Sequence, residues 1–320
     1  MESLFRQRIG FNGDLKELSK IICRDFDLGR FIACSVVLVG YEDFNFSLET
    51  TKRKFFVKVF SNTRTLDDCK RNVAVVVKLI DAGVFVPKLY PSEQGYLHIL
   101  KIDQSALRLC VMDFTEGKDF FTSRTTITHE DMRTLARQAA VINSLNIKPS
   151  HIYDSWAIVN FPREFEKKSE YLEQEDLELI QPLIEGFQSL TIETLPHCFV
   201  HGDILRTNVI KDNNAKIWIV DFSVSNYCPR IQELAVLACD ILFNKDNKIA
   251  SEQNLNDALE EYQKTITLTS RELESLPLYI KLAHAMHALC ANYEKKVNKN
   301  NSKENEYFLT IGRSGLRQMD

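Results

Sequence analysis

The stretch HGDILRTN, from His201 to Asn208, places an aspartate and an asparagine between short apolar runs. A second apolar run, IWIVDF, follows it and carries Asp221 near its end. The residues KDNNA between the two runs favour a tight turn, so the pattern predicts a β-hairpin. Asn208 would start one strand, Asp221 would end the other, and Asp203 lies on the loop that leads in. The three side chains are therefore expected at one end of the hairpin.

Three oxygen-bearing side chains at one place suit phosphoryl transfer. That reaction needs a carboxylate to orient the attacking hydroxyl and accept its proton, and oxygen ligands that hold Mg²⁺ on the phosphates. The spacing D-x-x-x-x-N followed by D-F is that of kinase catalytic loops, with HGD in place of HRD. Asp203 is then the base, and Asn208 and Asp221 are the Mg²⁺ ligands. Each residue alone would equally suit a turn, a cap or a strand end, but the joint pattern favours catalysis.

The bulk composition is that of a globular protein. The chain has 320 residues, of which 44% are hydrophobic and 26% charged, which is enough for one large core or two domains. The net charge of −4 offers no basic excess for a nucleic-acid backbone. Eight cysteines form no C-x-x-C pair, as in reduced cytosolic proteins, and no run reaches the length of a membrane span. We expect a cytoplasmic protein that binds neither nucleic acid nor membrane; its oligomeric state is left open.

The order of apolar patterns predicts an α+β fold in two parts. Helical spacing from about Leu15 to Asp25 precedes three strand-like runs, FIACSVVLVG, FNFSLET and KFFVKVF. A helix ending near Gly83 and two further strands, VFVPKLY and LRLCVMDF, complete a small antiparallel sheet with one long helix. Beyond Thr128 the chain is mostly helical. The predicted parts are residues 1–113 and 114–320.

HGDILRTN with IVDF resembles the signature of the aminoglycoside phosphotransferase and choline kinase superfamily of small-molecule kinases. The resemblance covers nearly the whole chain: VGYEDFNFSLETTKRKFFVKVF is similar to the nucleotide-covering hairpin, LRLCVMDFTEGKDF to the interlobe hinge, and PRIQELAVLACDI to the segment after the metal-binding aspartate. It implies a two-lobed protein-kinase-like fold, with ATP or GTP as co-substrate and Mg²⁺ as cofactor. Residues 1–113 would be the nucleotide-binding lobe and 114–320 the catalytic and substrate-binding lobe.

The resemblance also implies a nucleotide site in the first part. Lys58 would contact the α and β phosphates, the segment from Gly40 to Asn45 would cover the nucleotide, and Met112 to Phe114 would contact the base.

One departure from the family pattern concerns this lysine. Asn72 occupies the helix position where the family usually has the carboxylate that pairs with this lysine, and Asp68, one turn earlier, is a candidate substitute. A paired carboxylate orients the lysine. Its absence would favour a relaxed variant or a nucleotide-binding pseudokinase.

Arg206, Trp156 and Glu233 are the candidates for contact with the substrate. Arg206 suits either a substrate carboxylate or an internal pair with Glu233, and we favour the internal pair. Trp156 suits a wall of the substrate site or the core. The segments around them are similar to homoserine kinase-like and hydroxylysine kinase-like sequences. The predicted activity is transfer of the γ-phosphate to a hydroxyl of a small amine or amino acid (homoserine-, hydroxylysine- or choline-like); the alternatives are an aminoglycoside antibiotic phosphotransferase and a pseudokinase.

Overall fold

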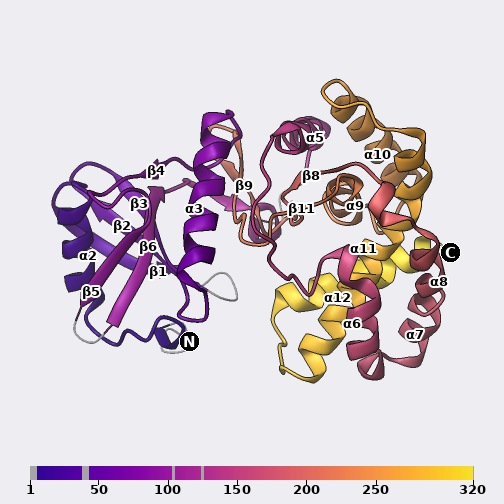
Figure 1. Ribbon diagram of the computed structural model, residues 1–320, viewed down its shortest axis with the longest axis horizontal. Coiled ribbons are helices and arrows are strands. Elements are labelled where there is room, and N and C mark those ends of the chain that lie inside the picture. Colours follow the sequence, from indigo (N-terminus) through magenta and orange to yellow (C-terminus); the bar gives the residue numbers. More distant parts are fainter. Residues whose placement is uncertain (1–5, 38–42, 103–104, 124–125, 320) are drawn as a thin grey trace. The chain divides into compact units, whose positions relative to one another are not determined.

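The computed structural model describes residues 6–37, 43–102, 105–123 and 126–319. The chain divides into two compact units, Met1–Gly117 and Lys118–Asp320 (Figure 1). Within the described ranges, no helix combines the length and the apolar character needed to cross a bilayer. Each unit has its own architecture.

The first unit is built on an antiparallel sheet with strand order β1-β2-β3-β6-β4, in which β5 also pairs with β6. The strands are β1 (Phe31–Val37), β2 (Phe44–Thr50), β3 (Lys54–Val59), β4 (Leu89–Tyr90), β5 (His98–Ile102) and β6 (Ser105–Asp113). Helix α2 (Leu15–Asp25) packs on one side and α3 (Leu66–Asp81) on the other, as Figure 1 shows.

Strand β3 divides its side chains between these two faces. Val57 and Val59 are buried in the core that contains α2. Residues on alternate positions of a strand face opposite sides, so Lys58 lies on the α3 side. In the register of β3 and β6, Lys58 stands opposite Cys110, which packs with Cys69 of α3. The sequence of β3 therefore places Lys58 on the face of the sheet that α3 covers, between the buried residues Val57 and Val59.

The second unit is mostly helical. Its helices are α4 (Phe120–Ser123), α5 (His129–Ser144), α6 (Phe161–Lys168), α7 (Gln174–Ile180), α8 (Leu183–Ser189), α9 (Ile231–Cys239), α10 (Lys248–Gln263), α11 (Ser270–Lys296) and α12 (Lys303–Gln318), with short 3₁₀ turns at Ile158–Asn160, Ser169–Tyr171 and Ile192–Thr194. The long α11 packs against α12, α9 and α6. Two small sheets accompany them, β10-β9-β7 and β11-β8. Their strands are β7 (Gly117–Asp119), β8 (His197–Val200), β9 (Val209–Asp212), β10 (Ile217–Ile219) and β11 (Asn226–Pro229).

The predicted α+β class is confirmed, and α2 has the predicted bounds. Three details differ from the sequence prediction. The VFVPKLY strand is reduced to β4, because Pro87 lacks the amide hydrogen that a longer ladder needs. Strand β5 was not predicted. Within the mostly helical part beyond Thr128, the segment PREFEKKSEYLEQEDLELIQPLIEGFQSL, which has the pattern of a long helical run, is divided into α6, α7 and α8, with Pro182 between the last two.

Candidate active site

The predicted hairpin is present and places its polar residues at one end. β9 and β10 pair antiparallel, with Val209 opposite Ile219. Asp212 forms the turn by accepting the backbone N–H groups of Asn214 and Lys216, each at 2.9 Å. At the open end, the Val220 N–H donates to the carbonyl of Asn208 at 3.0 Å, so Asn208 lies beside the residue that precedes Asp221. β8, in contrast, pairs with β11 and is not part of the hairpin.

Asp203 and Asn208 are in direct contact. The Asn208 Nδ2 donates to Asp203 Oδ2 at 2.6 Å and to the Asp203 carbonyl at 3.0 Å. This contact closes the loop over the five-residue spacing and assigns Nδ2 as the donor, so Oδ1 is the Asn208 atom that can face a cation. Asp221 follows the hairpin with a left-handed backbone, φ +64°. Non-glycine residues in this region are uncommon and cluster at functional sites.

The surroundings of Asp203 disfavour its charged form. Burial raises the pKa of its carboxyl well above the ordinary value, and the negative charges of Asp154 and Asp221 raise it further. The hydrogen bond from Asn208 acts in the opposite direction. A carboxylate with a raised pKa is a better proton acceptor than an ordinary aspartate, which suits a general base.

His201 braces this loop. Its Nδ1 accepts the Asp203 N–H at 3.1 Å, so the ring hydrogen lies on Nε2, which donates to the Val220 carbonyl at 3.2 Å. The ring is fully buried, and burial lowers its pKa to about 4. A neutral imidazole with both nitrogens bonded to backbone links the loop to the hairpin and cannot serve as the base.

Glu233 holds the same loop from α9. Its carboxylate accepts the N–H groups of His201 at 2.6 Å and Gly202 at 3.1 Å, and the Asn143 side chain at 3.2 Å. Burial raises its pKa to about 7, against the effect of these three donors. Because Glu233 is fully buried and both oxygens bind the loop or its support, we assign it to positioning and not to substrate contact.

Arg206 does not pair with Glu233, and that prediction was wrong. Its Nε donates to Asp240 Oδ1 at 3.0 Å, and its backbone N–H donates to Asp240 Oδ2 at 2.9 Å. Tyr307 of α12 also hydrogen-bonds to this carboxylate. Asp240 is completely buried, so its charge requires these partners. The acid that Arg206 meets is Asp240, which the sequence analysis did not single out.

The donor set of the hairpin fits Mg²⁺. Asn208 Oδ1 and the Asp221 carboxylate are hard oxygen donors, and Mg²⁺ is commonly held by one or two carboxylates together with substrate phosphates. No group of three or more His, Cys, Asp or Glu side chains among the described residues could hold a metal ion by itself.

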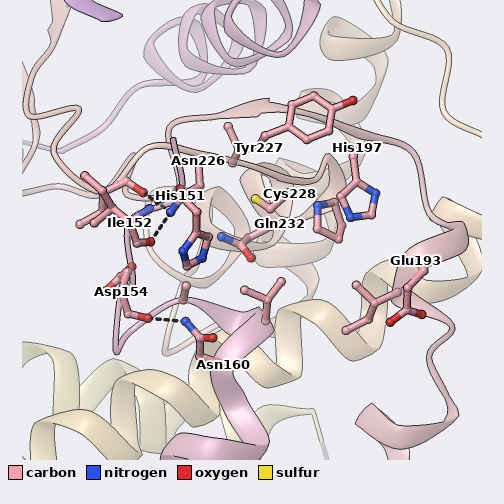
Figure 2. Close-up of a pocket in the computed structure, with 17 residues that line it drawn as sticks. His151, Ile152, Asp154, Asn160, Glu193, His197, Asn226, Tyr227, Cys228 and Gln232 are labelled. Atoms are coloured by element: carbon pink, nitrogen blue, oxygen red, sulfur yellow. Dashed lines mark hydrogen bonds between the residues drawn. The ribbon is translucent and has the colours of Figure 1, made fainter. Parts of the chain in front are cut away.

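A cavity of about 260 Å³ opens beside the loop that carries Asp203, within the second unit (Figure 2). Gly202, the neighbour of Asp203, lines it together with Asp154, Asn160 and Gln232. The Oε1 of Gln232 is buried and has no hydrogen-bond partner. Figure 2 shows the Gln232 amide among His151, Cys228 and Asn226. A buried acceptor without a donor is costly, so the cavity suits a ligand that carries N–H groups.

Trp156 does not line this cavity. Its ring packs against His287 of α11 and Phe308 of α12, with centroids 6.2 and 5.7 Å away. Its backbone N–H donates to Asp154 Oδ1 at 2.9 Å and thereby helps to orient that carboxylate. The cavity residues Asp154 and Gln232 were not predicted. The available signal was their position in YDSW and in IQEL, next to residues already singled out.

The residues predicted to bind nucleotide lie in the first unit. Asn45 of β2 stands directly opposite Lys58 of β3. Met112 lies near the end of β6, between Phe56 of β3 and Leu89 of β4.

Two further predicted residues complete this set. Phe114 follows β6, and the Lys54 ammonium lies 3.8 Å from its ring centroid. Gly40 lies outside the described residues. The roles of all these residues stay predictions.

A family model described as the phosphotransferase enzyme family (APH) matches residues 34–268. The chain belongs to this family. The match includes Lys58 and the hairpin with Asp203, Asn208 and Asp221. A search of curated proteins gives no match.

Solved structures of small-molecule kinases share the fold at low sequence identity. The amicoumacin kinase hAmiN, in complex with AMP-PNP, Ca²⁺ and Ami, aligns with TM-score 0.69 and 14% identity over 99% of this chain and 96% of its own. The choline kinase LicA from Streptococcus pneumoniae aligns with TM-score 0.62 and 16% identity over 94% and 99%. A microcompartment-associated aminopropanol kinase aligns with TM-score 0.62 and 13% identity over 94% and 95%. These likenesses agree with the predicted protein-kinase-like fold.

Proposed function

We propose that the protein transfers the γ-phosphate of a nucleoside triphosphate to a hydroxyl of a small amine, with Asp203 as the general base. The observation that carries the proposal is the Asp203–Asn208 contact at the open end of the hairpin, beside Asp221. One end of the hairpin thus offers a carboxylate with a raised pKa and two oxygen ligands for Mg²⁺. Bound there, the metal would neutralise charge on the transferred phosphoryl group.

The cavity beside the loop supports an amine as acceptor. Asp154 and the unpartnered Oε1 of Gln232 are both acceptors that an ammonium group can satisfy. The charges of Asp154, Asp221 and Glu304 all act on Asp203, so the surroundings of the base favour a cation.

The same cavity distinguishes among acceptors. Among the residues that the structure describes, no arginine or lysine lines it, and the guanidinium of Arg206 is bound by Asp240. A substrate carboxylate would lack a cationic partner there, which favours an amino alcohol over an amino acid. The volume of about 260 Å³ is below the roughly 300–1,000 Å³ typical of drug-sized ligands. That size favours a small amine over an aminoglycoside.

The test is a screen for acceptor-dependent nucleotide consumption with Mg²⁺ and ATP or GTP. The panel holds amino alcohols such as choline, ethanolamine and aminopropanol, hydroxylated amino acids such as homoserine and hydroxylysine, and aminoglycosides. We expect turnover with an amino alcohol and a matching phosphorylated product. Turnover only with aminoglycosides would replace the small-amine assignment. Nucleotide binding without any turnover would support the pseudokinase alternative.

A further inference from the structure

The carboxylate partner of Lys58 comes from a different element than the family pattern provides. At the corresponding place on α3 stands Asn72, a buried neutral residue. Asp68, one turn earlier, is half-buried and takes part in a capping box: Thr65 N–H and hydroxyl both donate to its Oδ2, at 3.1 and 2.7 Å. The helix N-terminus therefore uses the Asp68 carboxylate, and α3 offers no acid to Lys58 at either position.

Asp43, which immediately precedes β2, lies against Lys58 instead. The Lys58 Nζ is 3.2 Å from Asp43 Oδ2, and the two side chains are only 12% and 5% exposed. An ion pair this well shielded from water holds its geometry more firmly than a surface pair. The charge of Asp43 also acts on Cys69 of α3, whose pKa is raised mainly by burial. Asp43 therefore lies close to the face that α3 covers.

The other oxygen of Asp43 is held independently of Lys58. Asp43 Oδ1 accepts the backbone N–H of Ser61 and the Nε of Arg64, both at 3.0 Å. These two contacts come from the chain just after β3, the strand that carries Lys58. They fix the carboxylate so that only Oδ2 faces the ammonium.

We propose that Asp43 is the positioning carboxylate of the nucleotide site and orients Lys58 in place of a helix glutamate. This inference rests on the proposed function, in which Lys58 binds the nucleotide phosphates. It removes the one sequence feature, Asn72, that favoured a pseudokinase. The carboxylate has moved from α3 to the start of β2, and the lysine remains paired.

The test is a double-mutant cycle on the full chain with Asp43→Asn, Lys58→Met and the double variant, assayed for kcat with the acceptor found in the screen. Asp43→Asn keeps Oδ1 for Ser61 and Arg64 and replaces only the atom that faces Lys58. We expect about a 100-fold loss of kcat, since small errors in the placement of a reacting group cost that much. The double variant should lose no more than Lys58→Met alone, because Asp43 acts through Lys58. Losses that multiply would overturn the proposal.

Asp68→Asn is the matched control, with the same chemical change on a carboxylate that accepts hydrogen bonds from Thr65 at the N-terminus of α3. Its kcat should stay within about twofold of wild type. Equal losses in Asp68→Asn and Asp43→Asn would overturn the assignment.

A rescue variant covers the case in which Asp43→Asn is unstable. Asp43→Asn combined with Asn72→Glu returns a carboxylate to the buried face of α3. Recovery of at least tenfold in kcat supports the proposal. Recovery of the melting temperature without turnover assigns Asp43 a purely structural role and overturns it.

The failure of this inference differs from a failure of the proposed function. Wild-type protein that neither gains thermal stability with MgATP nor consumes it contradicts the proposed kinase itself. If the wild-type protein is active but the kcat losses of Asp43→Asn and Lys58→Met multiply in the double variant, only the role of Asp43 is contradicted.

Discussion

The two units each carry a shielded aspartate, and the two have opposite surroundings. Asp43 in the first unit lies between two cations, Lys58 at 3.2 Å and Arg64 at 3.0 Å. The Asp203 carboxylate in the second unit accepts a hydrogen bond from the neutral amide of Asn208 and is subject to the negative charges of Asp154 and Asp221.

This difference agrees with the two proposed roles, a positioning carboxylate for Asp43 and a general base for Asp203. Cationic partners hold a carboxylate in a fixed geometry through charge-assisted hydrogen bonds. Burial among other acids disfavours the ionised form and prepares the group to accept a proton from a hydroxyl. The same side chain thus suits two roles, and its neighbours decide which.

The strongest test of this contrast is Asp203→Asn. We expect kcat to fall about 10³-fold, within the range that a general base contributes. Nucleotide should still raise the melting temperature, because the amide preserves the loop. The matched control is Asp212→Asn, in the turn of the same hairpin, which should retain kcat. Near wild-type turnover in Asp203→Asn would remove the base assignment.

Asp203→Asn should also change the pH dependence of stability. The pKa of Asp203 is higher in the folded state than in the unfolded state. The wild-type protein therefore loses stability as the pH rises from the pKa of an ordinary aspartate to the raised pKa of the folded state. The asparagine variant cannot ionise and should unfold at or above the wild-type temperature at neutral pH. Thermal melts across pH measure this difference.

Glu233→Gln tests the support of the loop and should have the next largest effect. The Glu233 carboxylate accepts hydrogen bonds from His201, Gly202 and Asn143. A glutamine at this position would place its own N–H group against at least one of these donors, and that hydrogen bond would be lost. We expect a loss of about 1–3 kcal/mol in unfolding free energy and of about 100-fold in kcat through misplacement of Asp203.

The control for Glu233 is Glu272→Gln. Glu272 lies in the first turn of α11, is equally buried, and forms an ion pair with Arg230. The variant should lose comparable stability and keep its kcat at a temperature where it is folded. If both variants lose kcat equally, Glu233 has no specific role in the loop.

The pH profile of kcat at saturating acceptor tests the acidic surroundings of Asp203. Activity should rise with pH as Asp203 ionises, and this rise should occur at a pH above the pKa of an ordinary aspartate. Asp154→Asn removes the neighbouring charge that raises the pKa of Asp203 most, and it should move this acid limb of the profile to lower pH. Glu304→Gln should move it in the same direction by less, since its charge acts more weakly. A limb that stays in place in both variants would contradict the titration of Asp203.

The smallest effect on catalysis is expected from Arg206→Met. The change leaves Asp240 buried with Tyr307 and the Arg206 backbone N–H, so we expect about 1–3 kcal/mol of lost stability. The KM for the acceptor should change little. A selective rise in KM for acceptors that carry a carboxylate would instead restore Arg206 as a substrate contact.

Short-range features were predictable from the sequence. The hairpin, α2 and the alternation in β3 follow from turn residues and apolar periodicity within a few positions, and these patterns also located Asp203, Asn208, Asp221 and Lys58. The broken helical run after residue 161 was harder, because its segments are short and gain most of their stability from packing on other helices.

The sequence by itself singled out the candidate residues for the chemistry, since their spacing lies within one hairpin and one strand. Tertiary structure decided which groups surround them. Glu233 meets His201 across 32 positions, Arg206 meets Asp240 across 34, and Asp154 reaches Asp203 from a separate segment. A buried charge takes the partner that packing brings within a few ångströms, and packing depends on contacts that no local pattern encodes. For the same reason Lys58 is paired with Asp43, and neither Asn72 nor Asp68 takes that place.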